Sequence, residues 1–210
     1  MSIHNVQNGQ VLPFSTMTFP KDLFPFASIP KETADHFSLT LWCKSILGDI
    51  SLHPFSSESR ILKEHTGDTF TAITLRSPET IPYVQLFYSP PTSSRPFGEV
   101  DALMSFGSHI NGHIDTAHGG FIGVLLDDLI GCAAETARSK EKTTMTAYLN
   151  ITYKKPIGTP AVVLGRSWVE RQEGRKVFGK ATIEDGEGVV LASGDALFII
   201  VERVKLKGKL

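Results

Sequence analysis

The chain has 210 residues, of which 41% are hydrophobic and 20% are charged, and its formal net charge is −1. This length suffices for one large domain, or two small ones, with a sizeable core. The near-neutral charge argues against a nucleic-acid-binding protein, which needs surplus Lys and Arg to neutralise phosphates. The longest apolar run, residues 121–134, is shorter than the roughly 20 residues that cross a bilayer. It also contains Asp127 and Asp128, so we expect no membrane span.

Cysteine usage and the two ends of the chain bear on its location. Cys43 and Cys132 are too few for a disulfide framework or a metal cluster and are typical of a reducing compartment. The N-terminus lacks the charged and then apolar pattern of a secretory signal, and the first arginine is Arg60, which argues against a transit peptide. We therefore expect a cytoplasmic protein. The tail Gly208-Lys209-Leu210 resembles the peroxisomal Ser-Lys-Leu signal but differs at its first position, which makes peroxisomal import the minor alternative.

Residues 1–66 are expected to form an N-terminal arm and a helix that pack on the core. Prolines interrupt residues 1–35, which predicts an extended arm. Apolar side chains recur at helical intervals from Ala34 to Leu47, and Gly48 follows as a stop signal, which predicts a helix. Residues 48–68 are polar and predict a loop or a short helix.

Residues 67–204 are expected to form the main domain, followed by a C-terminal tail at 205–210. The pattern predicts strands at 69–76, 83–89 and 100–109, a long helix at 118–138, and strands at 143–153, 161–171, 175–185 and 189–201. Short Gly-containing turns separate most of the last four strands, which favours an antiparallel meander. The helix is apolar on nearly every face and must be wrapped. The sequence therefore predicts an α+β fold, a curled antiparallel sheet around one central helix.

The segment 115–120, Asp-Thr-Ala-His-Gly-Gly, opens directly into that helix. A helix N-terminus offers unpaired N–H groups and the positive end of the dipole. Gly119 and Gly120 carry no side chains that would keep a ligand oxygen away. This pattern indicates an oxyanion site, with amide donors for a carbonyl that becomes negative during acyl transfer. The alternative is a glycine-rich loop that only lets the helix pack closely.

Asp127 and Asp128 lie in the middle of the same helix with apolar neighbours on both sides. A buried carboxylate without a partner costs several kcal/mol, so one of the two needs a reason to be there. A general base is one reason, and a structural carboxylate satisfied by hydroxyl or N–H groups is the alternative. His118 and Asp127 are nine residues apart, roughly 13 Å along the helix. One substrate carbonyl cannot touch both, so joint action requires a second copy of the chain and predicts a homodimer with composite sites.

The strand at 143–153 continues into a basic segment. Strand alternation predicts one polar face and one apolar face that packs on the helix. The residues expected on the polar face are Thr146, Tyr148, Asn150, Thr152 and Lys154. Lys154 and Lys155, with Arg166, Arg175 and Lys176 on the following strands, are candidates to meet the phosphates of a nucleotide. A solvated sheet face is the alternative. The histidines show no metal-ligand spacing, and neither a P-loop nor a Gly-x-Ser-x-Gly elbow occurs, so no metal is expected.

His118-Gly119-Gly120 followed by Asp127 resembles the signature of the PaaI-like hotdog-fold acyl-CoA thioesterases. Residues 145–157, Met-Thr-Ala-Tyr-Leu-Asn-Ile-Thr-Tyr-Lys-Lys-Pro-Ile, resemble the corresponding strand of the type represented by thioesterase superfamily member four. Residues 173–176 and 196–199 continue the match. The resemblance covers about residues 99–202, whereas residues 1–98 match only loosely.

This resemblance implies a hotdog fold, a dimer or dimer of dimers, and thioester hydrolysis with no cofactor beyond the coenzyme A of the substrate. Carried over by position, Asp127 is the general base or nucleophile, Thr146 orients the attacking water, and the Gly119 amide polarises the carbonyl. His118 shapes the loop before the helix. The residues implied to contact the substrate and its coenzyme A moiety are Gly120, Thr152, Lys154, Arg175 and Lys176.

Two residues complicate the family pattern. Asp115 brings a negative charge close to the expected oxyanion site and, if it points inward, opposes the stabilisation of an oxyanion. Asp128 leaves the register of the catalytic aspartate open by one residue, and because adjacent helical residues differ by about 100°, only one of the two faces the site.

The leading hypothesis is a hydrolase of acyl-CoA or acyl-carrier-protein thioesters in lipid or polyketide metabolism. A second hypothesis keeps the same site but releases a chain from a polyketide or fatty-acid synthase by cyclisation. A third is a non-catalytic acyl-CoA-binding protein, which the charge of Asp115 favours. Acyl chain length is not readable from the sequence.

Overall fold

The structure is a computed structural model that describes residues 6–7, 10–11, 27–64 and 66–203. Of the expected N-terminal arm, it describes the short antiparallel pair β1 (Val6–Gln7) and β2 (Gln10–Val11) and the residues from 27 onward. The expected tail, with its peroxisome-like ending, lies outside the described residues.

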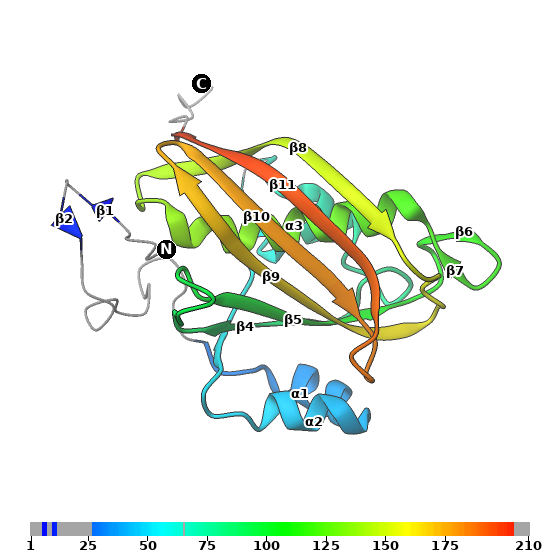
Figure 1. The fold of residues 1–210 in the computed structure, drawn as a ribbon. Coiled ribbons are helices and arrows are strands. Elements are labelled where there is room, and N and C mark those ends of the chain that lie inside the picture. Colours follow the sequence, from blue (N-terminus) through cyan, green and yellow to red (C-terminus); the bar gives the residue numbers. More distant parts are fainter. Residues whose placement is uncertain (1–5, 8–9, 12–26, 65, 204–210) are drawn as a thin grey trace.

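A seven-stranded antiparallel sheet forms the body of the molecule (Figure 1). In spatial order its strands are β3 (His53–Phe55), β4 (Val84–Ser89), β5 (Glu99–Phe106), β9 (Ala161–Glu173), β10 (Lys176–Glu184), β11 (Val190–Glu202) and β8 (Lys142–Tyr153). The strands predicted at 83–89, 100–109 and in the last third are confirmed within a few residues. Strand β3 lies before the expected boundary at residue 66 and nevertheless pairs with β4.

The predicted four-strand meander is only partly correct. Strands β9, β10 and β11 follow one another as neighbours, but β8 pairs with β11 and not with β9. Residues 154–160, which include two prolines, connect β8 to β9 without forming a tight hairpin turn. Strand β8 consequently lies at the edge of the sheet with no strand on its outer side among the described residues.

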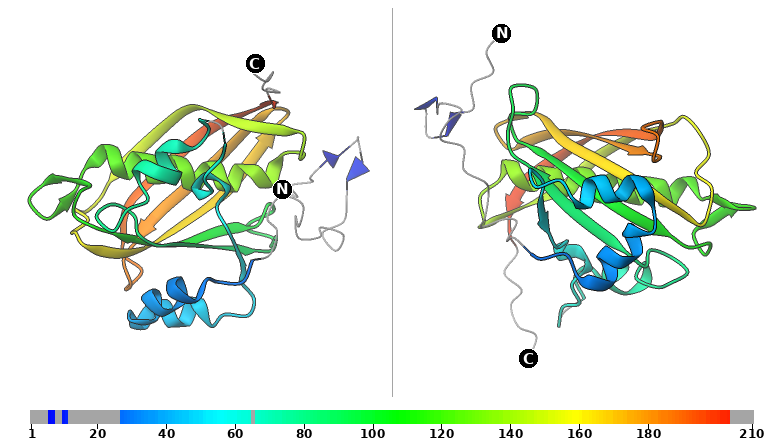
Figure 2. Two further views of the ribbon diagram at one scale, coloured as in Figure 1. Left: turned by 180° about the vertical axis from the view of Figure 1, so that it is seen from behind. Right: turned by 90° about the horizontal axis from the view of Figure 1, so that it is seen from below.

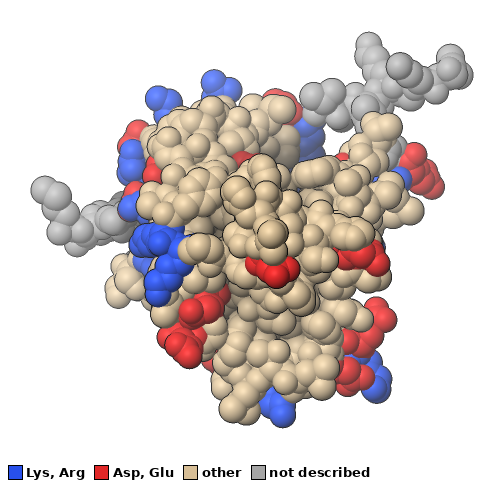
Figure 3. Space-filling model, turned by 90° about the vertical axis from the view of Figure 1, so that its right-hand side faces the viewer, with Lys and Arg blue, Asp and Glu red and all other residues tan. Residues whose placement is uncertain are grey.

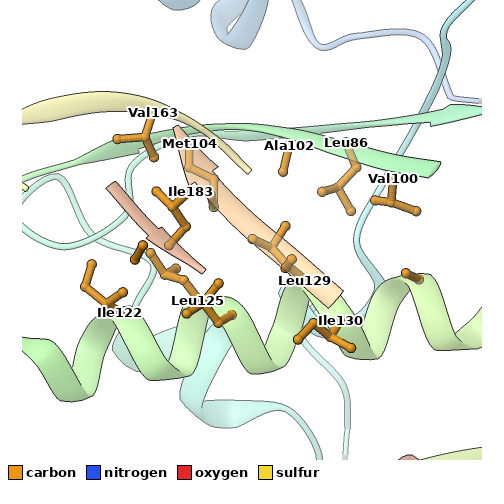
Figure 4. Packing of buried hydrophobic residues seen from close by; sticks show 14 of the residues in the cluster. Leu86, Val100, Ala102, Met104, Ile122, Leu125, Leu129, Ile130, Val163 and Ile183 are labelled. Atoms are coloured by element: carbon orange, nitrogen blue, oxygen red, sulfur yellow. The ribbon is translucent and has the colours of Figure 1, made fainter. Parts of the chain in front are cut away.

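The long helix α3 (Gly119–Ala134), extended by the 3-10 turn η4 (Glu135–Ala137), packs on the concave face of the sheet. Figure 4 shows Leu129 rising from α3 toward Ala102 and Leu86 on the strands above it. Glycines on the sheet permit this close approach, because a Cβ on Gly179 would lie 2.4 Å from Cγ2 of Ile130. The predicted α+β arrangement of a sheet wrapped around one central helix is confirmed.

The helix predicted at 34–47 is in fact two helices, α1 (Lys31–Ser38) and α2 (Leu41–Leu47). The chain breaks at Thr40, whose backbone is extended. The break turns the second helix so that Phe37 and Cys43 are both buried against the outer, convex face of the sheet, where they join Phe87 and Leu103 in a second apolar cluster. Figure 2 shows the pair lying over β4 and β5.

The strand predicted at 69–76 is wrong. Residues 56–76 contain the 3-10 turn η2 (Glu58–Arg60) and the π-helical turn η3 (Phe70–Thr74). Ala72 and Leu75 are buried while Phe70 and Ile73 are more than half exposed, so the burial repeats every three residues, as in a helix and not a strand. This segment lies across the side of α3 that faces away from the sheet (Figure 2).

A short hairpin, β6 (Asn111–His113) and β7 (Thr116–Ala117), leads from β5 into α3. In Figure 1 it projects beyond the N-terminal end of α3. Over the described residues, no helix has the length and apolar character needed to span a membrane.

Candidate active site

The start of α3 is built around the side chain of His118. This residue caps the helix, and its Nδ1 accepts a hydrogen bond of 2.9 Å from the Gly120 N–H. The proton of the neutral imidazole therefore lies on Nε2. Gly112 packs against the ring so closely that a Cβ there would lie 2.7 Å from Cδ2 of His118. The first N–H groups of a helix lack intrahelical acceptors, and among the described residues that of Gly119 accordingly has no partner, which leaves it free to donate to a ligand.

Tyr153, at the end of β8, contacts the same helix start. Its hydroxyl donates a hydrogen bond of 2.9 Å to the Gly119 carbonyl. Tyr153 and Gly119 line a cleft of about 290 Å³ together with Lys154, Lys155 and Ile157. Figure 3 faces this end of the molecule, where a largely uncharged surface has Lys and Arg side chains gathered at one side. The sequence placed Tyr153 only on the apolar face of its strand, although an aromatic ring with a polar tip at a strand end indicates such a double contact.

Asp127 lies two turns further along α3 and accepts a hydrogen bond of 2.9 Å from Thr146 on β8. Strict alternation predicted Thr146 on the face away from the helix, and this is wrong. The pairing of β8 with β11 shifts by one residue between Tyr148 and Thr146, so that Ala147 forms a β-bulge. A bulge reverses the alternation beyond it, which brings Thr146 to the side of the strand that faces α3.

Asp128 turns to a different side of the helix, toward residues 57–71. Its side chain is exposed and opens onto a hollow that Asp127 also lines. Partial desolvation by the surrounding protein raises the pKa of Asp128 to about 6, a hydrogen bond with Ser59 works in the opposite direction, and the charge of Asp127 raises the pKa further. The two aspartates are thus distinguished by geometry, because only Asp127 contacts β8.

The hollow beside Asp127 has a volume of about 690 Å³ and a lining of mixed charge. Its lining includes Asp127, Asp128, Thr144, Thr146, Lys63, Arg138, Lys140 and Arg203. Sequence patterns gave no sign that these four cations meet, because they come from three separate segments of the chain. Two of them are paired, Lys63 with Asp68 and Arg138 with Glu135.

The residues expected to contact substrate fall into two groups at opposite ends of β8. Thr152 and Lys154 lie beside the start of α3, where Thr152 pairs with Ser193 on β11. Arg175 and Lys176 lie at the other end, since Lys176 pairs with Ile199, which in turn pairs with Met145.

The helix start and Asp127 are similarly separated, by about 12 Å along α3. Within one protomer the expected site residues therefore form two separate groups. His118, Gly119 and Gly120 lie near Lys154, and Asp127 lies beside Thr146.

Asp115 lies at the tip of the β6–β7 hairpin with a positive φ of 49°. Its carbonyl accepts a hydrogen bond from the Thr159 N–H, and its side chain is exposed. In the part of the chain that the structure describes, its carboxylate forms no hydrogen bond with the first amides of α3. In the same residues, no three His, Cys, Asp or Glu side chains are grouped to hold a metal ion.

Comparison with known proteins supports the resemblance. Residues 115–192 match the family model of the thioesterase superfamily. The acyl-coenzyme A thioesterase THEM4 of Mus musculus is 38% identical over 105 residues, which are 50% of this chain and 44% of the mouse protein. THEM4 of Rattus norvegicus is 39% identical over 98 residues, 46% of this chain and 41% of the rat protein. The matched region thus spans less than half of each of these relatives.

Among solved structures, a thioesterase family protein from Silicibacter pomeroyi superposes with a TM-score of 0.52 at 16% identity, covering 65% of this chain and 95% of that one. This likeness shows the fold. The hotdog fold and the resemblance to hotdog-fold thioesterases that the sequence indicated are therefore confirmed.

Proposed function

We propose that this protein hydrolyses acyl thioesters of coenzyme A or of an acyl carrier protein. The observation that carries the proposal is the hydrogen bond between Thr146 and Asp127 at the open edge of the sheet. It orients one carboxylate oxygen and leaves the other to accept a proton from water. THEM4 of mouse and rat are named acyl-coenzyme A thioesterases, which agrees with this chemistry.

The reaction needs two groups that one protomer keeps apart. Asp127 takes a proton from a water molecule that Thr146 helps to orient, and the water oxygen forms a bond to the thioester carbonyl carbon. The Gly119 N–H, at the positive end of the helix dipole, donates to the carbonyl oxygen as it becomes negative. The intermediate then collapses, the carbon–sulfur bond breaks, and the thiolate leaves and takes up a proton. The products are a carboxylic acid and a free thiol.

A second copy of the chain brings the two groups together. Strand β8 is twelve residues long and exposes Met145, Tyr148 and Tyr153. A long edge strand with unpaired N–H and C=O groups is a template for pairing with another chain. Residues opposite each other in an antiparallel pair share a face of the sheet.

Two copies of β8 can pair about a two-fold axis with Tyr153 opposite the partner's Thr146. These two side chains share a face of the sheet, because both contact α3. In that register Gly119 of one protomer approaches Asp127 of the partner subunit. Lys154 and Lys155 then lie at the same end as Arg175 and Lys176 of the partner subunit, and these four cations are suited to the phosphates of coenzyme A.

The hydrolase proposal is tested by thiol release from short, long and aromatic acyl-CoAs. Asp127→Asn is expected to lower kcat by roughly 100-fold or more, as for the loss of a general base. The matched control Asp195→Asn keeps the wild-type rate, because that side chain is exposed on β11 and bonds Asn150. Equal loss in both variants, or a lactone in place of the free acid, contradicts the proposal. The two thiols, Cys43 and Cys132, are free, which suits a reducing compartment, and a cytoplasmic location is part of the proposal.

A further inference from the structure

A second, smaller cavity lies between α3 and strands β4 and β5. Its volume is about 40 Å³. Its apolar walls are Leu86, Ala102 and Met104 on the sheet and Val124, Leu125 and Leu129 on α3. Figure 4 shows the side chains of Leu125 and Leu129 on the face of α3 that is turned toward these strands. These apolar walls favour an apolar group.

The cavity adjoins the hollow that holds Asp127. Ser57, Asp128 and Cys132 line both spaces. Ser57 and Asp128 place polar groups at this junction, Arg60 and Thr71 add polar groups to the outer wall, and the other walls are hydrocarbon. The two spaces therefore meet beside Asp128, which is the side from which an apolar chain attached to a carbonyl beside Asp127 would enter.

The segment that closes the cavity is held in place by hydrogen bonds. Arg60 donates from Nη2 to the Ile81 carbonyl at 2.8 Å, and Arg76 donates to the Arg60 carbonyl at 3.0 Å. Thr71 donates to the Ser59 carbonyl. Leu75 is buried and forms part of the lining. These bonds fix the outer wall against α3, so the size of the cavity is a property of the fold.

We propose that this cavity binds the acyl group of the substrate and restricts it to short aliphatic chains. The inference rests on the proposed function and narrows its substrate class. By the same measure of volume a water molecule needs about 10–15 Å³, so the cavity accepts about three such units. With the carbonyl carbon outside, acyl groups of about three to five carbons fit. Longer chains and aromatic rings do not fit, because the segment containing Arg60, Thr71 and Leu75 closes the far side.

The test is kcat/KM for straight-chain acyl-CoAs from two to sixteen carbons and for benzoyl-CoA. The wild type is expected to prefer three to five carbons, with a fall of roughly tenfold for each further methylene that finds no room. Met104→Ala enlarges the cavity and moves the optimum to longer chains. Leu103→Ala is the matched control, since Leu103 is the next residue on β5, is equally buried, and faces the outer cluster under α1 and α2. It leaves the preference unchanged. Ala102→Val narrows the cavity and is expected to move the optimum to shorter chains. This variant keeps the proposal testable if Met104→Ala does not fold.

Equilibrium binding of the same acyl-CoAs to Asp127→Asn, followed by calorimetry, separates this inference from the proposed function. If affinity peaks at three to five carbons but the wild type hydrolyses none of the acyl-CoAs, the cavity selects the acyl chain and the hydrolase proposal is rejected. If wild type and Met104→Ala hydrolyse acyl-CoAs with the same chain preference, the cavity does not select the acyl chain, although the protein is a hydrolase. A preference of the wild type for long chains leads to the same conclusion.

Discussion

Thr146 reaches Asp127, at 2.9 Å, only because Ala147 between it and Tyr148 is bulged out of the pairing with β11. Without the bulge, the alternation of β8 points the Thr146 hydroxyl away from α3. Bulges frequently re-aim side chains next to active sites. This one joins the edge strand to the carboxylate that we propose as the general base.

The Thr146 hydroxyl is therefore expected to matter for catalysis and little for folding. Thr146→Val removes the donor to Asp127 while it keeps the shape of the side chain. We expect kcat to fall about tenfold, because the carboxylate loses the bond that orients it. Thr144→Val is the control, since Thr144 lies at the same edge and bonds Glu135 instead. Equal rates in the two variants contradict a role for Thr146.

Tyr153 is predicted to act as a positioning residue for the oxyanion donor. Tyr153→Phe keeps the ring and removes the hydrogen bond to the Gly119 carbonyl. We expect a fall in kcat of about tenfold with KM nearly unchanged, since the misplaced amide serves the transition state. Tyr148→Phe on the same strand is the matched control. A change in KM alone, with kcat retained, assigns Tyr153 to substrate binding and rejects the positioning role.

Much of this architecture follows from sequence periodicity, and the exceptions have physical causes. The strands from residue 83 onward and the central helix are long and strongly patterned, and their positions are confirmed. The segment 69–76 looks like a strand because Phe70 and Ala72 alternate with polar residues, but burial of Ala72 and Leu75 selects a helical turn. That selection depends on packing against α3, which local sequence does not encode.

The candidate site likewise contains some residues that the sequence indicates and others that it does not. His118 and Gly119 at the start of α3 are visible in the sequence because a cap and two glycines precede an apolar run. The bulge at Ala147 leaves no local signal, since it is fixed by the partner strand β11. The second contact of Tyr153 escapes periodicity for a similar reason, because it joins residues 34 positions apart.

Asp101 is a buried acid on the outer face of β5, away from the candidate site. It is 5% exposed, and within the described residues its Oδ1 has no hydrogen-bond partner. Burial raises the pKa of Asp101 to about 7, the Arg166 guanidinium at 3.5 Å opposes this, and the acidic Glu99 and Glu184 add to it. The folded chain therefore holds a proton there that the unfolded chain releases near pH 4.

The free energy of unfolding should then depend on pH through Asp101. Because the folded-state pKa is the higher one, stability falls as the pH rises from about 4 to about 7, and this group adds no further change above that range. Asp101→Asn removes the dependence and is expected to stabilise the protein at pH 8, by up to roughly 4 kcal/mol. Denaturant unfolding at pH 5 and pH 8 measures this, with the exposed Asp195→Asn as control. The assignment is disproved if the wild type is more stable at pH 8 than at pH 5 and Asp101→Asn shows the same pH dependence of its free energy of unfolding.

The central claim is that Gly119 of one protomer and Asp127 of the partner subunit form one site. Two inactive variants test it. Asp127→Asn removes the base, and Gly119→Pro removes the oxyanion donor at the first helical position, where proline is well tolerated. The three atoms nearest to a Cβ on Gly119 would all belong to the Tyr153 side chain, at ordinary contact distances of 3.4–3.6 Å.

The decisive measurement is the activity of an equal mixture of these two variants after their subunits have been exchanged. Random pairing makes half of the dimers mixed, and each mixed dimer contains one site with both defects and one intact site. The account predicts recovery of about one quarter of the wild-type activity. If each site is formed within one chain, every site in the mixture carries a defect, and an exchanged mixture that stays inactive contradicts the account.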